Sequence, residues 1–145
     1  MFTITQNEQE TILLAQELAK KSKPGDILAL SGQLGSGKTV FARGFCSFFG
    51  VTEAVTSPTY VVMKEYRLRK ASNGVSKIIH VDSYRIDEAD SIGLSDYFQE
   101  KNVIILIEWP EKIIYSLPPS IKKIKFQYLG DSHRKISYKK NDFNN

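Results

Sequence analysis

The apolar residues of this chain recur with two different periods, one typical of helices and the other of buried strands. In residues 40–49, four phenylalanines follow one another at helical intervals, so one side of the predicted helix is apolar. Residues 8–21 show the same period and come directly after Asn7, a residue type that favours helix starts. Residues 26–30 and 103–107 form short apolar runs, which are typical of strands covered on both faces.

Further strands are expected where apolar and polar residues alternate or β-favouring residues gather. They comprise residues 2–5, 60–68, 77–82, 124–128 and 134–138. The pair Asn73-Gly74 predicts a tight antiparallel hairpin. Residues 88–98, interrupted by Gly93, indicate a helical or turn segment, and residues 139–145 are expected to fray. These elements predict one domain over residues 1–145, an α/β fold of three layers with a mostly parallel central sheet, antiparallel hairpin additions and helices on both faces.

A glycine-rich stretch joins the strand at residues 26–30 to the phenylalanine-rich helix. It matches the phosphate-loop pattern G-x-x-x-x-G-K-[ST] at Gly32, Gly37, Lys38 and Thr39. Glycines let backbone N–H groups approach phosphate oxygens, the lysine places a positive charge on the β- and γ-phosphates, and the threonine hydroxyl binds Mg²⁺. The flanking strand and helix are the setting in which this motif binds nucleotides; the alternative is a glycine-rich turn with an accidental lysine. The nucleotide-binding residues expected here are Gly35, Ser36, Gly37, Lys38, Thr39 and Val40.

Two acidic residues stand at the carboxyl ends of predicted strands, Asp82 and Glu108. Hydrolysis of a nucleotide needs a carboxylate near Mg²⁺, and the ligands of parallel sheets gather at this edge. Glu108 is the stronger candidate, because its strand is so apolar that it should lie inside the sheet beside the phosphate loop. We expect Glu108, Asp82 and Lys38 to be catalytic, with Thr39 and Glu108 as metal ligands. The alternative for each acid is a solvated strand end.

Several neighbouring residues are open to more than one interpretation. The polar loop at residues 51–59 could sense the γ-phosphate through Thr56, Ser57 or Thr59, or it could be an ordinary surface loop. Arg85 could neutralise charge on the γ-phosphate or pair with an acid. The guanine-reading sequence [NT]-K-x-D does not occur in the chain, so ATP is the expected nucleotide.

Charge and composition bear on the partners and the compartment. The chain carries 20 Lys and Arg against 16 Asp and Glu, and from Pro118 onward seven basic residues stand against two acidic ones. This bias could favour an anionic partner such as RNA or an acidic protein, or the lysines could guard a strand edge. With two histidines and one cysteine, a zinc site at His80 is not expected, and Cys46 reads as a small core residue. Because no apolar run reaches membrane-spanning length, we expect a cytoplasmic protein.

Four motifs, taken together, resemble one family of bacterial proteins. They are the phosphate loop at residues 32–39, S-P-T-Y at residues 57–60, H-x-D-x-Y-R at residues 80–85 and E-W-P at residues 108–110. Their order is similar to that of the TsaE proteins, phosphate-loop NTPases of threonylcarbamoyladenosine biosynthesis in tRNA. The resemblance extends from the helix after Asn7 to the hairpin at Arg134. One departure is Gln33, where the family commonly carries an acidic residue.

The resemblance implies an ATPase that binds ATP and Mg²⁺ and is required for the modification of adenosine 37 in tRNAs reading codons that begin with A. It also implies partners similar to TsaB and TsaD, with the tRNA engaged indirectly through them. Within the chain it implies that Glu8 and Arg134 lie near the nucleotide and that Trp109 lies beside the site. Two other functions use the same loop: a small-molecule kinase, and a nucleotide-gated binding module that does not hydrolyse ATP.

Overall fold

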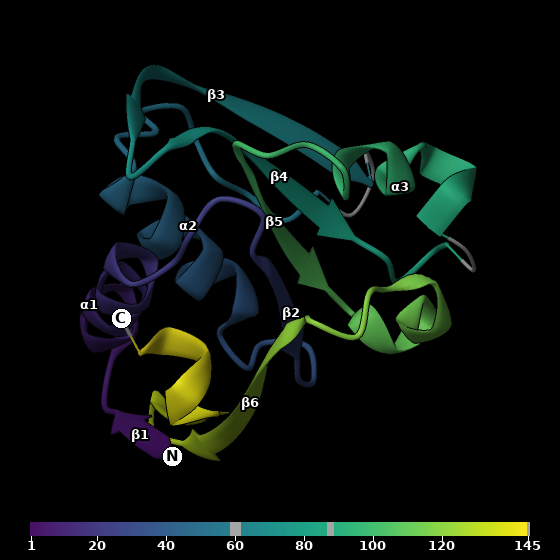
Figure 1. Cartoon of the computed structure of the whole chain (residues 1–145). Helices are drawn as coiled ribbons and strands as arrows, with labels where there is room; N and C mark the ends of the chain where they lie inside the picture. The colour runs from purple at the N-terminus through teal and green to yellow at the C-terminus, as the bar shows by residue number, and fades with distance from the viewer. Residues whose placement is uncertain (59–61, 87–88, 145) are drawn as a thin grey trace.

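The computed structural model describes residues 1–58, 62–86 and 89–144. Among these residues, seven strands form one sheet in the order β1-β7-β6-β2-β5-β4-β3 (Figure 1). The strands are β1 (Phe2–Thr5), β2 (Ile27–Ser31), β3 (Met63–Ser72), β4 (Val75–Asp82), β5 (Val103–Glu108), β6 (Lys122–Gly130) and β7 (His133–Tyr138). The central strands β6, β2, β5 and β4 run parallel, whereas β1, β7 and β3 are added by antiparallel pairing. Three strand pairs are parallel and three are antiparallel, so the sheet as a whole is mixed, with a parallel centre and antiparallel additions at its edges.

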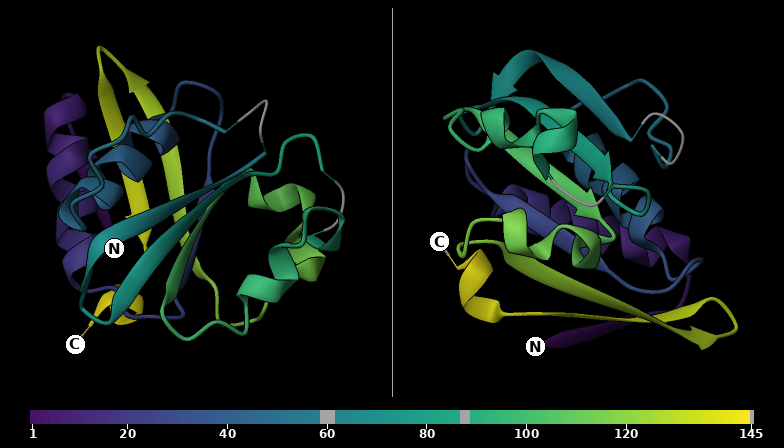
Figure 2. Two further views of the ribbon diagram at one scale, coloured as in Figure 1. Left: turned by 90° about the horizontal axis from the view of Figure 1, so that it is seen from above. Right: turned by 90° about the vertical axis from the view of Figure 1, so that its right-hand side faces the viewer.

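Helices α1 (Glu8–Lys20) and α2 (Lys38–Phe48) lie on one face of the sheet, as the two views of Figure 2 show. A core of buried side chains fills the space between these helices and the strands. Phe41 and Phe45 of α2 and Leu106 of β5 belong to it. The predicted apolar side of the phenylalanine-rich helix is therefore the side that faces the sheet.

The opposite face of the sheet carries short helical segments. These are η1 (Ala89–Ile92), α3 (Leu94–Tyr97), η2 (Pro110–Lys112) and η3 (Ile114–Ser116), while η4 (Lys140–Phe143) ends the described chain. Leu94 and Ile113 form a second core with side chains of the sheet. Ile105 and Ile107 of β5 belong to this core, whereas Leu106 belongs to the first, so all of β5 is buried. The prediction that this strand is covered on both faces is confirmed.

Local sequence patterns at the ends of elements are also confirmed. Asn7 Oδ1 accepts a 2.9 Å hydrogen bond from the N–H of Glu10 and so caps α1. Asn73 and Gly74, with φ of +52° and +78°, form the two-residue turn between β3 and β4. Gly93 separates η1 from α3. Residues 60, 61 and 88, which belong to a predicted strand and a predicted helix, lie outside the described residues.

The C-terminal segment differs from the expectation that residues 139–145 fray. Phe143, the last residue of η4, is buried, and its ring lies 5.7 Å from the ring of Tyr138. The ammonium group of Lys122 lies 4.8 Å from the same phenyl ring. These contacts hold the segment against the sheet up to Phe143, and the one with Lys122 joins residues 21 positions apart, which no local pattern specifies.

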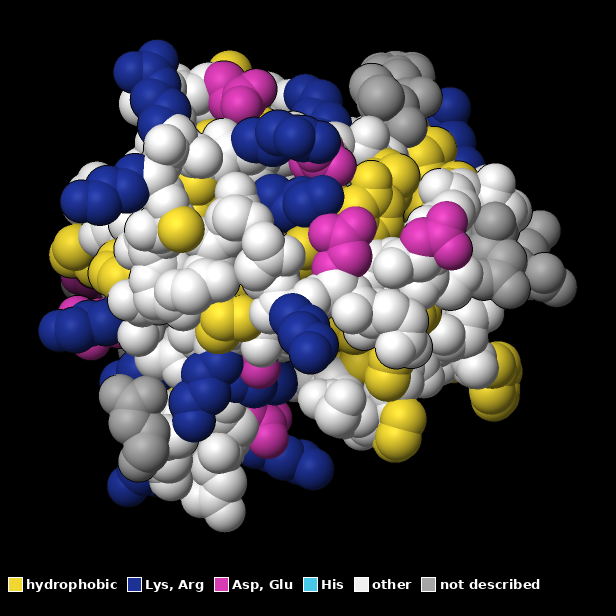
Figure 3. All heavy atoms as spheres, turned by 45° about the horizontal axis from the view of Figure 1, so that its top comes forward, with side chains coloured by type: hydrophobic (Ala, Val, Ile, Leu, Met, Phe, Trp, Pro, Cys, Tyr) yellow, Lys and Arg dark blue, Asp and Glu magenta, His cyan; other side chains and the backbone are white. Residues whose placement is uncertain are grey.

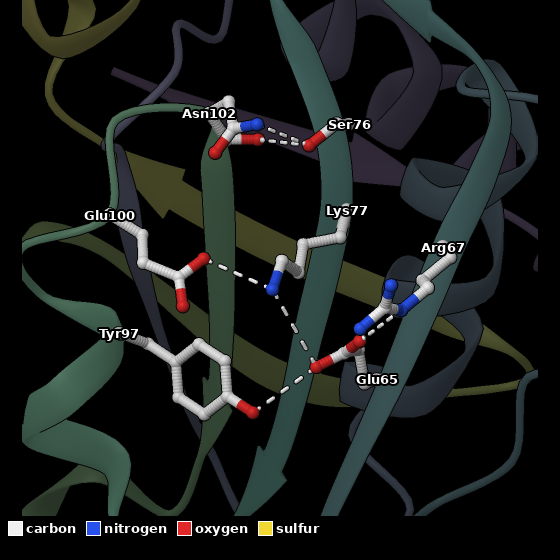
Figure 4. Close-up of polar contacts among 7 residues, drawn as sticks. All are labelled: Glu65, Arg67, Ser76, Lys77, Tyr97, Glu100 and Asn102. Atoms are coloured by element: carbon white, nitrogen blue, oxygen red, sulfur yellow. Dashed lines mark hydrogen bonds and ion pairs between the residues drawn. The ribbon is translucent and has the colours of Figure 1, made fainter.

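A polar cluster fixes α3 to the outer strands β3 and β4 (Figure 4). The hydroxyl of Tyr97 donates to Glu65 at 3.1 Å, and the ammonium group of Lys77 lies 3.0 Å from Glu100. Burial raises the pKa of Glu65, but hydrogen bonds from Arg67 and Tyr97 and the charge of Lys77 outweigh it and lower this pKa below 4.5. The chain that follows β4, including α3 and Glu100, is therefore held against β3 and β4.

Charged side chains of both signs are mixed over the face seen in Figure 3. Two basic residues of the C-terminal part make specific contacts: Lys122 lies 2.6 Å from Asp26, and the Lys135 ammonium group lies 4.5 Å from the centre of the Phe2 ring. Whether the basic bias serves an anionic partner stays a prediction. None of the described helices is both long and apolar enough to cross a membrane.

Candidate functional site

The phosphate-loop motif forms a tight connection between β2 and α2, which begins at Lys38. Gly37 has a φ of +106°, a value that favours glycine, and a Cβ at this position would lie 2.7 Å from Arg134 Cδ. A Cβ at Gly32 would lie 2.6 Å from the carbonyl oxygen of Phe126. A side chain at Gly32 is therefore excluded by the backbone of β6, whereas one at Gly37 would require the Arg134 side chain to move.

A cavity of about 560 Å³ opens beside this loop, at the carboxyl ends of β4 and β5. Its wall comprises Glu8, Leu34, Gly35, Gly37, Lys38, Thr39, Val40, Ser57, Asp82, Tyr84, Arg85, Glu108, Trp109 and Arg134. The wall includes the predicted catalytic residues and the predicted nucleotide-binding residues other than Ser36. The hydroxyl of Ser36 is buried under the loop, where a Cβ on Gly32 would lie 2.6 Å from it.

The two predicted acids lie side by side, because Asp82 on β4 pairs with Glu108 on β5 in the parallel register. Both are buried, with 4% and 2% of their surfaces exposed, so neither is a solvated strand end. Glu108 Oε1 accepts a 2.9 Å hydrogen bond from the Thr39 hydroxyl. Asp82 accepts 3.1 Å and 2.9 Å hydrogen bonds from the Ser57 hydroxyl and the Tyr84 N–H. The fold thus brings both acids, the phosphate-loop threonine and the polar loop to one place.

The described residues of the polar loop and Arg85, whose roles were left open, do not all border the cavity. Thr56 accepts a 3.1 Å hydrogen bond from Lys64 and is not part of the cavity wall, and Thr59 lies outside the described residues. Arg85 borders the cavity from an exposed position. Ser57 is therefore the polar-loop residue that the structure brings to the site.

The side chain of Lys38 is buried at the floor of the phosphate loop. Its ammonium group donates to the carbonyl oxygens of Gly32 and, at 2.9 Å, Gln33, and it lies 4.4 Å from the centre of the Trp109 ring. Burial lowers the pKa of Lys38, and the negative charges of Glu108, Glu111 and Asp82 oppose this effect. The loop therefore holds the lysine beside the cavity through its own carbonyl groups.

Glu8 and Arg134 reach the same cavity from opposite ends of the chain. Glu8 is exposed at the start of α1 and lies 3.3 Å from Arg43. Arg134 is 8% exposed and donates to the carbonyl oxygen of Ser132 at 3.2 Å. Its Nε is buried and has no hydrogen-bond partner among the described residues. A buried donor of this kind, next to Gly37, suits an anionic ligand.

Two residues that support Glu108 were not recognised from the sequence. Nε2 of the fully buried His80 lies 2.8 Å from Glu108 Oε2. The hydroxyl of Ser83 donates to the carbonyl oxygens of Glu108 and Trp109, at 2.8 Å and 2.6 Å. The signal available for His80 was its place two residues before Asp82, which puts both side chains on the same side of one strand.

The oxygen atoms at the site suit Mg²⁺ better than a metal that prefers nitrogen or sulfur. Within the described ranges, no group of three or more His, Cys, Asp and Glu side chains could hold a metal ion. The Thr39 hydroxyl and the Glu108 carboxylate are hard oxygen ligands, and Mg²⁺ in nucleotide sites commonly takes one or two protein oxygens together with phosphate oxygens and water. The residues therefore fit a magnesium–nucleotide complex.

Comparison with known proteins gives a consistent picture. Residues 5–136 match the family described as threonylcarbamoyl adenosine biosynthesis protein TsaE. The chain is 40% identical over 135 residues to the Bacillus subtilis tRNA threonylcarbamoyladenosine biosynthesis protein TsaE. The aligned region covers 92% of this chain and 82% of that protein. The protein of the same name from Rickettsia conorii is 37% identical over 133 residues, and the aligned region covers 90% of this chain and 73% of that protein.

Among solved structures, the fold is similar to that of Bacillus subtilis YdiB. The two structures agree with a TM-score of 0.78 and share 36% sequence identity, over 95% of this chain and 83% of the other. The similarity thus extends through the sheet and both helices that build the cavity. From the match over residues 5–136 and the identity to its relatives, the chain belongs to the TsaE family.

Proposed function

We propose that this chain is a phosphate-loop ATPase that binds ATP together with Mg²⁺ in the cavity beside Lys38. The observation that carries the proposal is the 2.9 Å hydrogen bond between the Thr39 hydroxyl and Glu108 Oε1. A phosphate-loop hydroxyl and a carboxylate at a strand end are the protein ligands that hold Mg²⁺ in phosphate-loop NTPases. In this interpretation, the mixed sheet with a core on each face is the three-layer fold of that class.

The phosphate groups would bind at the loop and at the N-terminus of α2. Backbone N–H groups of residues 35–40 and the positive end of the helix dipole favour negative charge there. Lys38 turns from the carbonyl groups of Gly32 and Gln33 to the phosphates, exchanging neutral hydrogen-bond acceptors for charged ones. Arg134, with its buried Nε beside Gly37, adds a further donor.

Asp82 is the residue proposed to orient the attacking water. The Ser57 hydroxyl and the Tyr84 N–H donate to its two oxygens, and these bonds fix the carboxylate at the cavity wall. Glu108 and Thr39 would hold the metal ion, whose charge offsets the negative charge of the phosphates. Lys38, Asp82 and Glu108 thus divide phosphate binding, water positioning and metal binding between them.

The biological role we propose is the modification of adenosine 37 of tRNA to threonylcarbamoyladenosine. It is supported by membership of the TsaE family and by relatives that carry the name of this pathway. The chain would act in a complex with TsaB- and TsaD-like proteins in the cytoplasm, engage tRNA indirectly, and hydrolyse ATP slowly without these partners.

Phosphate release from ATP, with and without Mg²⁺ and the two partner proteins, tests the proposal. Lys38→Ala should weaken ADP binding. Glu108→Gln should leave the affinity for ADP unchanged and lower the rate of ATP turnover by about 100-fold, the order of effect seen when a charge-stabilising group is lost. Lys123→Ala is the control, because Lys123 is exposed on β6 and is not part of the cavity wall.

The same assay separates the other uses of a phosphate loop. Turnover of the Glu108→Gln variant at the parental rate would contradict the metal-ligand role. Transfer of the phosphoryl group to a small metabolite would indicate a kinase. Nucleotide-dependent association with the partners, without any release of phosphate, would indicate a binding module.

A further inference from the structure

We propose that His80 is a positioning residue that fixes the Glu108 carboxylate for metal binding, an inference that rests on the proposed function. His80 is fully buried on β4, and its Nε2 lies 2.8 Å from Glu108 Oε2. Its register partner is Leu106, two residues before Glu108 on β5, so the imidazole lies one step deeper in the sheet than the acids. It does not line the cavity and can act on the site through Glu108.

The direction of this hydrogen bond follows from the chemistry of its two groups. A carboxylate accepts hydrogen bonds, so Nε2 of His80 carries the hydrogen and donates it to Oε2. Nδ1 is buried and has no hydrogen-bond partner within the part of the chain that the structure describes. A tautomer with its hydrogen on Nδ1 would bury an unpaired donor and lose the bond to Glu108, so the geometry favours Nε2–H.

The consequence for Glu108 is that each oxygen is engaged by a different element. Oε1 accepts from Thr39 at the start of α2, and Oε2 accepts from His80 on β4. Two donors on opposite oxygens fix the plane of the carboxylate and turn Oε1 toward the phosphate loop. Without His80, Oε2 would be buried without this donor, and the carboxylate could rotate away from the orientation that faces Thr39.

Partners of this kind, which hydrogen-bond a metal ligand from behind, typically change metal affinity by about 10- to 100-fold when they are removed. We therefore expect the loss of the His80 donor to weaken metal binding while nucleotide binding through the loop persists. A histidine that serves only the core would instead lower stability without a specific effect on the metal.

Three replacements of His80 separate these possibilities. Gln can place an N–H near the position of Nε2, Asn is too short to reach it, and Leu fills the space without any donor. Ile78→Val is the matched control, because Ile78 is fully buried on the same side of β4 but packs in the apolar core. For each variant of the full chain, the affinity for ADP is first measured with EDTA present. In separate samples without EDTA, Mg²⁺ is then titrated into the ADP complex.

The expected result is an Mg²⁺ requirement about tenfold higher for His80→Asn and His80→Leu, with ADP affinity in EDTA unchanged. His80→Gln and Ile78→Val should stay near the parent. Should His80→Leu fail to fold, as judged by circular dichroism, the Gln and Asn variants alone decide the question. The assignment would be overturned if His80→Gln and His80→Asn had equal Mg²⁺ requirements. It would also be overturned if Ile78→Val raised the Mg²⁺ requirement as much as His80→Asn.

The outcome is distinguishable from a failure of the proposed function. If the unaltered chain releases phosphate and His80→Asn matches it at every Mg²⁺ concentration, the positioning role is wrong and the ATPase proposal stands. If the unaltered chain never releases phosphate, even with its partners, the ATPase proposal is wrong, while the titration of the ADP complex still measures the effect of His80.

Discussion

Replacing Gly37 with alanine should destabilise the protein more than the same replacement at Gly25, although both glycines have left-handed backbones. The φ angles are +106° at Gly37 and +90° at Gly25, so alanine at either position carries a similar strain of about 1–2 kcal/mol. A Cβ at Gly25 would meet no atom within 4 Å. At Gly37 it would lie 2.7 Å from Arg134 Cδ and 2.8 Å from its Nε, well inside van der Waals contact.

The additional loss at Gly37 can be worked out from what Arg134 must give up. Its side chain would have to move toward the cavity that it borders, and this movement breaks the 3.2 Å hydrogen bond to the Ser132 carbonyl. A bond of this kind contributes about 0.5–1.5 kcal/mol. Gly37→Ala should therefore lower the free energy of unfolding by about 2–3.5 kcal/mol, against about 1–2 kcal/mol for Gly25→Ala.

Urea unfolding at pH 7 without nucleotide, followed by circular dichroism, measures both losses. ADP binding supplies a second readout, because Gly37→Ala should displace Arg134 from the cavity wall whereas Gly25→Ala leaves it in place. A double variant with Arg134→Ala should lose the extra destabilisation, since the clash is removed. Equal losses of stability for the two single variants would refute the close contact between the loop and β7.

Three further predictions concern groups around the site and in the core. Ser83→Ala removes a hydroxyl that donates to two carbonyl oxygens where β5 ends, so urea titration should show a loss of about 1–3 kcal/mol. Burial raises the pKa of Cys46 to about 12, so its thiol should resist iodoacetamide at pH 8 until denaturant is added; fast labelling of the native protein would contradict this. The folded-state pKa of Glu65 lies below 4.5, so its contribution to stability is present above pH 4.5 and is lost as the pH falls through the lowered value. Tyr97→Phe should therefore reduce the difference between the free energies of unfolding at pH 7 and pH 3, and an unchanged difference would show that this hydrogen bond has no effect.

The parts of the fold that could be predicted from the sequence depend on residues close together in the chain. The helical spacing of Phe41 and Phe45 predicts α2, and the turn residues Asn73 and Gly74 predict the β3–β4 hairpin. The order of the strands in the sheet could not be predicted, because it depends on which distant strands meet. Phe2 pairs with Ser137, for example, and no local pattern specifies that register.

The candidate site divides in the same way. Asp82 and Glu108 could be predicted as strand-end acids near a phosphate loop, but their adjacency depends on the register between β4 and β5. That register also brings His80 within hydrogen-bonding distance of an acid 28 positions away. A histidine inside an apolar strand looks the same in the sequence whether it packs in a core or holds a carboxylate. Ser83 was missed because its acceptors are backbone atoms of another strand end.

The two buried acids also explain why so many hydrogen-bond donors converge on this edge of the sheet. Carboxylates at neighbouring strand ends repel each other and lose hydration when they are buried, so without donors they would destabilise the fold. Here the donors come from separate elements: the hydroxyl of Thr39 from α2, the imidazole of His80 from β4 and the hydroxyl of Ser57 from the loop before β3. Because each donor selects a particular oxygen, the hydrogen bonds that make the buried charge tolerable also determine which oxygens face the cavity. The stability of this edge and the geometry of the site are therefore one property of the fold.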